Sequence, residues 1–196
     1  MTPPAVRIWA VPGLLLLSVV AARNRLESDM ALHMLVEFPI LVGVGWLFAS
    51  SAGERLRARI APFNVQGLSG LLYALSVSAL WMIPRALDAT QVDPWIELGK
   101  FVSLLGAGAA LQLSWTRAGT VVQAFALLHW AWMTASVGML YQDTDVRLCN
   151  FYLTDQQALS GTGLVGLAGL ALVVWCASVG IDIVRAEAVC ESSAVH

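Results

Sequence analysis

The chain has 196 residues, of which 58% are hydrophobic and only 12% are charged. A soluble domain usually carries roughly twice that charged fraction, so the composition favours a protein of the lipid bilayer over a soluble one. The net charge of -2 and the lack of a basic run in the sequence give no sign of a nucleic-acid partner. The three cysteines, Cys149, Cys176 and Cys190, form no CxxC pair and do not support a zinc or thioredoxin-like site.

Six mainly apolar runs approach or exceed the length of about 20 residues that a membrane span requires. They lie at about 8–22, 30–50, 65–83, 95–115, 118–141 and 159–183. The first run is short, and we expect an uncleaved helix because no clean signal-peptide cleavage site precedes Arg23. The sequence therefore predicts an all-α polytopic transmembrane bundle of about six helices. It forms a single domain over residues 1–184, and residues 185–196 are expected to be a disordered cytoplasmic tail.

Basic residues mark alternate loops of this predicted bundle. Those in the loops after the second, fourth and sixth runs are Arg55, Arg57, Arg59, Arg117 and Arg185. The positive-inside rule places these loops in the cytoplasm, and with them both termini. Most acidic residues then fall on the outer side, which agrees with this orientation.

Ionisable groups inside the hydrocarbon are costly, by about 3 kcal/mol or more at mid-depth, so each one indicates a function or a partner. His33 and Glu37 are four residues apart and share a helical face. Pro39 follows them and frees a backbone carbonyl about one turn back. Lys100 is open to three interpretations: an ion pair with Glu37 across the bundle, an ion pair with Glu97 along its own helix, or snorkelling to the outer interface.

A soft metal site is the sharper hypothesis for the outer half of the bundle. Imidazole and thioether ligands suit copper, especially Cu(I), and the candidate ligands are His33, Met34, Met82 and His129. A packing role for the histidines and methionines stays open. So does a haem held by His33 and His129, although the predicted helix boundaries place these two at different depths. A proton or ion pathway through Glu37, Lys100 and His129 is a further alternative.

Three stretches of this chain resemble a known family. They are HMLVEFPILVG at 33–43, LWMIPRALDA at 80–89 and DQQALSG at 155–161. In this order they resemble CtaG-type cytochrome oxidase assembly factors, which are multi-helix membrane proteins linked to the maturation of copper-containing terminal oxidases. Glu97 falls where that family has a Glu-His pair. The resemblance implies help in copper delivery to, or assembly of, a terminal cytochrome oxidase at the outer face of a bacterial inner membrane.

The departures from the family pattern fall on histidine positions. Glu37, Met82 and Leu98 stand where histidines would be expected, and His33 keeps its type. If the family's histidines bind metal, much of that set has been lost, with His129 as a compensating ligand. Glu37, Glu97 and Lys100 are then expected in supporting or ion-pair roles, and Asp155 and Gln156 in ordering the outer loop.

The sequence gives no sign of an enzyme. It contains no evident nucleophile–base pair, phosphate loop or catalytic carboxylate dyad, so we expect a non-catalytic protein. The partners that the resemblance implies, besides membrane lipid, are oxidase subunits or a periplasmic copper chaperone. The rival functions are a structural scaffold subunit of a membrane complex without its own metal, and a haem-binding electron-transfer membrane protein.

Overall fold

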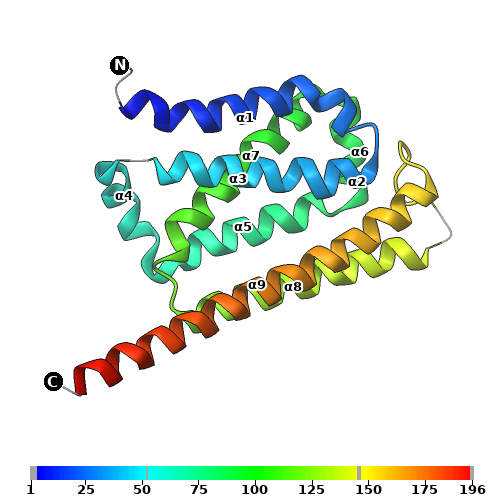
Figure 1. Ribbon diagram of the computed structural model, residues 1–196. Coiled ribbons are helices and arrows are strands. Elements are labelled where there is room, and N and C mark those ends of the chain that lie inside the picture. Colours follow the sequence, from blue (N-terminus) through cyan, green and yellow to red (C-terminus); the bar gives the residue numbers. More distant parts are fainter. Residues whose placement is uncertain (1–3, 52, 145–146, 195–196) are drawn as a thin grey trace.

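The computed structural model describes residues 4–51, 53–144 and 147–194, with side chains considered at 9–51, 53, 57–144 and 147–185. In this part of the chain every regular element is a helix, which confirms the all-α class (Figure 1). In chain order the elements are α1 (Pro4–Leu26), α2 (Met30–Leu32), a π-helical turn η1 (His33–Glu37), α3 (Phe38–Ser50), α4 (Glu54–Ile60), the 3-10 turns η2 (Ala61–Phe63) and η3 (Val65–Gly67), α5 (Leu68–Trp81), α6 (Pro84–Val92), α7 (Pro94–Trp115), α8 (Thr120–Asp143) and α9 (Thr154–Ala194).

Among the described residues, four helices are long and apolar enough to cross a membrane. They are Met30–Ser50, Pro94–Trp115, Thr120–Asp143 and Thr154–Arg185. A fifth would come from Arg57–Phe63 with Val65–Trp81, two segments that meet at a bend of 72°. The apolar run at 8–22 is helical as part of α1, but α1 is not among these candidates. The prediction of several helices long and apolar enough to span a membrane is therefore confirmed, whereas the count of six spans and their orientation stay predictions.

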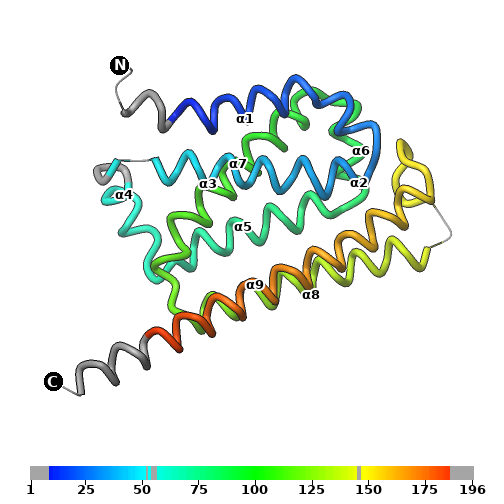
Figure 2. The backbone as a smooth tube through the Cα atoms, viewed as in Figure 1, coloured from blue at the N-terminus to red at the C-terminus, as the bar shows by residue number. Residues whose placement is uncertain are grey.

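The long helices run back and forth between two ends of the bundle (Figure 1). One end, here called the α6 end, carries α6, the link between α1 and α2, and the segment 147–153. The other end carries α4 and is called the α4 end. The described part of α1 begins and α9 ends on the α4 side (Figure 1). In Figure 2 the coloured part of α9 runs from the α6 end toward that side. The sequence predicted a disordered tail at 185–196. Of these residues, Arg185 is described with its side chain, 186–194 are described only as helical backbone, and 195–196 lie outside the described residues.

The pairing of α3 with α7 is the centre of the bundle. A Cβ added at Gly45 of α3 would meet the backbone carbonyl of Leu105, and one added at Gly108 of α7 would meet the backbone carbonyl of Val42. Only glycine allows the two backbones to lie this close. α1 packs on α3 and α5 packs on α7, while α8 and α9 form an antiparallel pair beside them. The close contact fixes how residues near the α6 end of α3 and α7 face each other.

Two capping residues start the helices that reach the α6 end. Asp29 precedes α2 and its side chain accepts hydrogen bonds from the backbone N–H groups of Ala31 and Leu32. Asp93 precedes α7 and accepts from the N–H of Trp95. A carboxylate at this position satisfies otherwise unpaired donors of the first turn. These caps fix the start of α2, which leads directly into η1, and the start of α7. The elements η1 and α7 supply three of the polar side chains described next.

Candidate functional site

Five polar side chains from four parts of the chain meet at the α6 end. Lys100 comes from the second turn of α7, Glu27 from the link between α1 and α2, His33 and Glu37 from η1, and Tyr152 from the segment 147–153. We call these five residues the lysine cluster. Lys100, His33 and Glu37 are 0% exposed, so the cluster is a buried polar centre inside an apolar bundle.

The ammonium group of Lys100 lies between three acceptor atoms. Its Nζ donates to Glu27 Oε1 at 2.6 Å and lies 3.1 Å from His33 Nε2. It also forms an ion pair with Glu37 Oε1 at 2.8 Å, although that contact lacks the orientation of a hydrogen bond. An ammonium group has three N–H donors, so its three neighbours match its capacity.

Both ring nitrogens of His33 are engaged. Nδ1 lies 2.7 Å from the Tyr152 hydroxyl, which itself donates to the backbone carbonyl of Glu27 at 3.1 Å. Because that hydroxyl has a single proton, His33 Nδ1 has to carry the hydrogen and donate it to Tyr152. Nε2 is then an acceptor whose lone pair faces Lys100. The imidazole is therefore neutral and held in one tautomer.

The carboxylates outnumber the cations in this cluster. Glu27 and Glu37 face the single ammonium of Lys100, and His33 is neutral. Glu37 Oε2 lies 3.8 Å from His33 Nε2 and has no hydrogen-bond partner among the described residues. A buried carboxylate oxygen is costly unless it is paired. Glu37 is thus paired with Lys100 through Oε1 alone, and Oε2 remains a buried acceptor near His33.

The π-helical turn η1 carries two members of the cluster. Pro39 has no backbone N–H, and its ring would clash with the preceding turn of a regular α-helix. The chain accommodates it with a wider turn in which the N–H of Phe38 donates to the carbonyl of His33, five residues back. The local distortion that the sequence predicted from Pro39 is thus present. Such π-turns occur frequently at functional sites.

The structure decides among the three interpretations of Lys100, which is buried and does not snorkel to the surface. Lys100 pairs with Glu37 across the bundle, which confirms one of the predicted alternatives. Glu97 instead accepts from Arg23 Nη1 at 2.6 Å, and Arg23 is half-exposed. That second pair lies at the head of an apolar groove of about 450 Å³ between α1 and α7. Glu97 therefore holds α1 to α7 rather than supporting Lys100.

The four predicted copper ligands do not all come together. Met34 and Met82 pack in one buried apolar cluster at the α6 end. The sulfur of Met82 accepts from Thr134 Oγ1 at 3.8 Å. His129 is exposed on α8 and stacks on Phe125 of its own helix. Because His33 Nε2 faces an ammonium and His129 stands apart, these four residues do not fit a copper site as they are arranged.

The segment 147–153 is held mainly by residues other than the two predicted for it. Asp155 is exposed, and Gln156 Oε1 accepts only a long hydrogen bond, 3.4 Å, from the N–H of Leu153. Its neighbour Gln157 is buried and accepts from the N–H of Leu148 at 3.0 Å. Asp88 of α6 accepts from the backbone and side-chain nitrogens of Asn150 at 2.8 and 3.0 Å.

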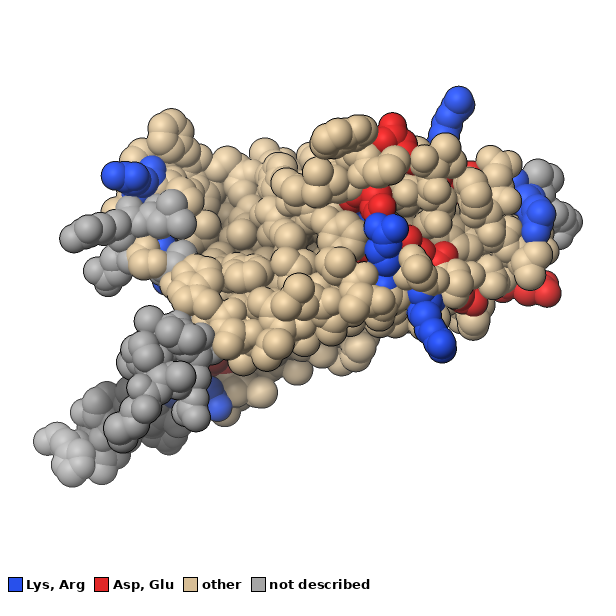
Figure 3. Space-filling model, turned by 90° about the horizontal axis from the view of Figure 1, so that it is seen from above, with Lys and Arg blue, Asp and Glu red and all other residues tan. Residues whose placement is uncertain are grey.

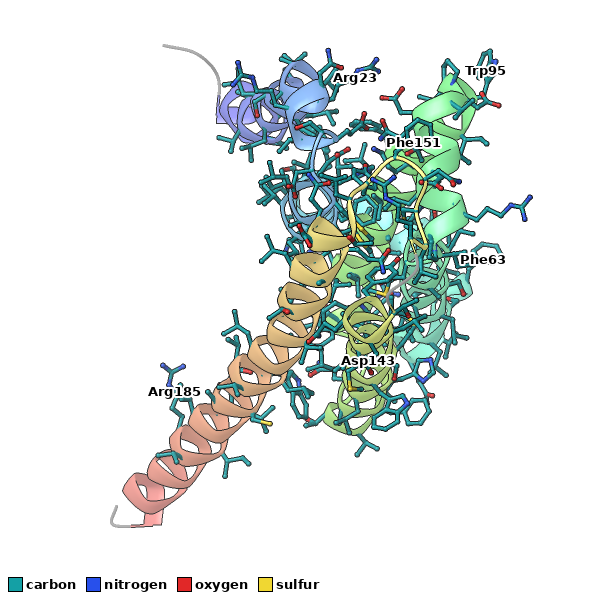
Figure 4. All side chains as sticks on the ribbon, turned by 90° about the vertical axis from the view of Figure 1, so that its right-hand side faces the viewer. Arg23, Phe63, Trp95, Asp143, Phe151 and Arg185 are labelled. Carbon is teal, nitrogen blue, oxygen red and sulfur yellow. The ribbon has the colours of Figure 1, made fainter. Side chains whose placement is uncertain are left out.

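The segment 147–153 covers the α6 end of the bundle. Figure 4 looks at this end, and Phe151 of the segment lies between α1, where Arg23 is labelled, and the start of α7, where Trp95 is labelled. The segment brings Tyr152 onto His33, and Gln91 of α6 also approaches the Tyr152 hydroxyl at 3.4 Å. Sequence analysis missed Glu27 and Tyr152 as members of the cluster because both lie outside the apolar runs.

Replacing Tyr152 with phenylalanine is expected to lower the free energy of unfolding by about 1–3 kcal/mol. The change leaves the buried His33 Nδ1–H and the Glu27 carbonyl without their partner. Hydrogen exchange of the backbone amides of 147–153 should become faster. Tyr73→Phe is the matched control, because its exposed hydroxyl makes only a 3.5 Å contact with the Ser103 carbonyl. Equal effects of the two changes would contradict the role assigned to Tyr152.

Cys149 is a buried thiol next to Asp88. Burial, and secondarily the Asp88 carboxylate, raise the pKa of the Cys149 thiol to about 12. The thiolate is the reactive form, so its fraction at pH 8 falls by roughly 1000-fold relative to an ordinary thiol. In a Cys176→Ala, Cys190→Ala background we expect iodoacetamide to modify Cys149 slowly in the native protein and readily after unfolding. Rapid native labelling at pH 8 would be inconsistent with this burial.

Comparisons with protein-family models, with curated proteins and with solved structures found no match for this chain. What the protein does is therefore inferred from its own residues, their geometry and the resemblance of three short stretches.

Proposed function

We propose that this protein is a non-catalytic membrane helper in the assembly of a copper-containing terminal oxidase, and that it acts through its α6 end. The main support for this proposal is that the three stretches resembling CtaG-type factors lie together at the α6 end. Met34 and Met82, from the first two stretches, pack in the same buried cluster. That cluster also includes Leu164, three residues after the third stretch.

The proposed role is to guide assembly rather than to store copper. His33, Met34, Met82 and His129 do not form a copper site in the present arrangement, for the reasons given above. A structural scaffold subunit of another membrane complex is the second candidate, and the saturation of Lys100 by protein groups favours it. A haem-binding role has no comparable support, because both ring nitrogens of His33 are engaged and His129 lies on an exposed face.

The proposed topology has six spans: the four long apolar helices, the bent segment from Arg57 to Trp81, and α1. Both termini then lie in the cytoplasm of a bacterial cell. Arg57 and Arg117 lie at the α4 end, which supports placing that end in the cytoplasm. In the view of Figure 3, the acidic residues of the visible face lie toward the α6 end. The α6 end would then face the periplasm, where oxidase subunits or a periplasmic copper chaperone could meet it.

Removing the gene from its host tests the proposal. We expect membranes of the deletion strain to lose terminal-oxidase activity and the optical spectrum of the assembled oxidase, and the wild-type gene to restore both. Added copper should not rescue the strain, and the purified protein should carry less than one copper per chain. Rescue by copper would instead favour a copper carrier. Normal oxidase levels without the gene would favour the scaffold of another complex.

Exposed aromatic residues at the two ends give a matched test of the surface that acts. Trp95 at the α6 end is 78% exposed and Phe63 at the α4 end is 82% exposed. Because neither side chain is needed for packing, Trp95→Ala and Phe63→Ala should both leave the fold intact. We expect only Trp95→Ala to lower oxidase assembly. An effect confined to Phe63→Ala would place the acting surface at the α4 end and contradict the proposal.

A further inference from the structure

Three side chains of the lysine cluster place potential metal-ligand atoms close together. One ligand atom each from Glu27, His33 and Glu37 can be chosen so that all lie within 4.8 Å of one another. The Lys100 ammonium lies among them, at 2.6 to 3.1 Å from one atom of each residue. The three side chains thus surround a positive charge that the protein itself supplies.

We propose that Glu27, His33 and Glu37 form a three-ligand site for a divalent transition-metal ion, and that the Lys100 ammonium is its built-in occupant. Two carboxylate oxygens and one imidazole nitrogen are a set that Zn²⁺ and Co²⁺ accept, with water as a fourth ligand. Zinc–ligand bonds are about 2.0–2.2 Å long. Each ligand atom would therefore have to move inward by roughly 0.5–1 Å to replace contacts with the ammonium by bonds to a metal.

Two further features of the cluster are those of a metal site rather than of a simple ion pair. Glu37 Oε2 is buried, points toward His33 and has no hydrogen-bond partner among the described residues. His33 donates from Nδ1 to Tyr152, which leaves Nε2 as the ligand atom. A metal-bound histidine almost always donates its other ring N–H in this way, which fixes the ring and its tautomer.

This site is independent of the oxidase proposal. Whether Glu27, His33 and Glu37 bind a metal ion depends on the residue at position 100 and not on any role in oxidase assembly. In the wild type, the Lys100 ammonium occupies the space between the three ligand atoms and would repel a metal ion there. The wild-type protein is thus built to hold this end of the bundle together without a metal, while keeping the ligands of one.

Removing the ammonium tests the site. In the detergent-purified full chain, Lys100→Ala is expected to bind one Zn²⁺ by equilibrium dialysis and to show visible absorption bands with Co²⁺. Its thermal unfolding temperature should rise with added Zn²⁺. Wild-type protein should show none of these at the same metal concentration. If Lys100→Ala accumulates poorly, Zn²⁺ supplied during expression should raise its yield, and an unchanged yield counts against the proposal.

Further variants in the Lys100→Ala background separate this site from adventitious binding. His33→Ala should abolish Zn²⁺ binding, and Tyr152→Phe should weaken it by about 10- to 100-fold. His129→Ala is the matched control and should leave binding unchanged, because His129 is exposed on α8. Equal metal affinity in the wild type and in Lys100→Ala would overturn the proposal. So would binding that survives His33→Ala.

Discussion

Lys100→Met is expected to lower the free energy of unfolding by about 3–5 kcal/mol. The methionine keeps most of the side-chain volume but removes the charge. Glu27, Glu37 and the acceptor nitrogen of His33 would then face one another without a cation between them. Reversible unfolding in detergent micelles, followed by circular dichroism, measures the loss.

A second change distinguishes the ion pair from a general packing effect. Glu37→Gln removes one carboxylate charge and should restore part of the stability lost in Lys100→Met. A double-mutant cycle should give a coupling of about 1–3 kcal/mol, and additive losses would argue against the pair. Arg23→Met is the matched control, because it breaks an ion pair in which Arg23 is half-exposed. That change should cost no more than about 1 kcal/mol.

The large effect at position 100 and the small one at position 23 have one physical origin. Water screens the charge of Arg23, whereas Lys100 is 0% exposed and depends wholly on protein groups. This difference also explains why Lys100 could be interpreted from the sequence. A lysine within an apolar run needs a partner, and Glu37 was one of two carboxylates placed within reach.

Hydropathy predicted the long helices because the length of an apolar run is a property of the chain alone. The run at 95–115 became α7, Pro94–Trp115, and the run at 118–141 became α8, Thr120–Asp143. The helices α4 and α6 were not predicted, because they are short and lie between the runs. The run at 65–83 begins with a bend at Gln66 and Gly67, which both have positive φ.

Prediction from apolar runs has two limits here. Glu27 and Tyr152 lie in connecting segments, and the packing of such segments depends on tertiary contacts that hydropathy does not encode. His129 shows the second limit. Its helix is apolar on most sides, so the sequence does not say which face turns inward. The predicted metal set placed His129 in the interior, whereas the structure leaves it exposed.

The second large effect is expected at Gly108, where α7 approaches α3. Gly108→Ala would place a methyl group against the backbone carbonyl of Val42, and within 2.9 Å of the Trp46 nitrogen. Because backbone atoms at a helix contact cannot rotate away, the two helices have to separate. Overpacking usually costs about 1–3 kcal/mol, and we expect a value at the upper end of that range.

Gly99→Ala on the same helix is the matched control, because a Cβ there meets nothing within 4 Å. Alanine is the better helix former, by up to about 1 kcal/mol, so Gly99→Ala should be neutral or stabilising. The two substitutions are thus expected to change the unfolding free energy in opposite directions. Gly108 follows Lys100 by eight residues, and Gly45 follows Glu37 by the same number. Separation at the glycines should therefore also weaken the contact between Lys100 and Glu37, and the coupling between those two residues should fall in Gly108→Ala. Unchanged coupling would mean that the lysine cluster is held by its own contacts and not by the close packing of α3 with α7.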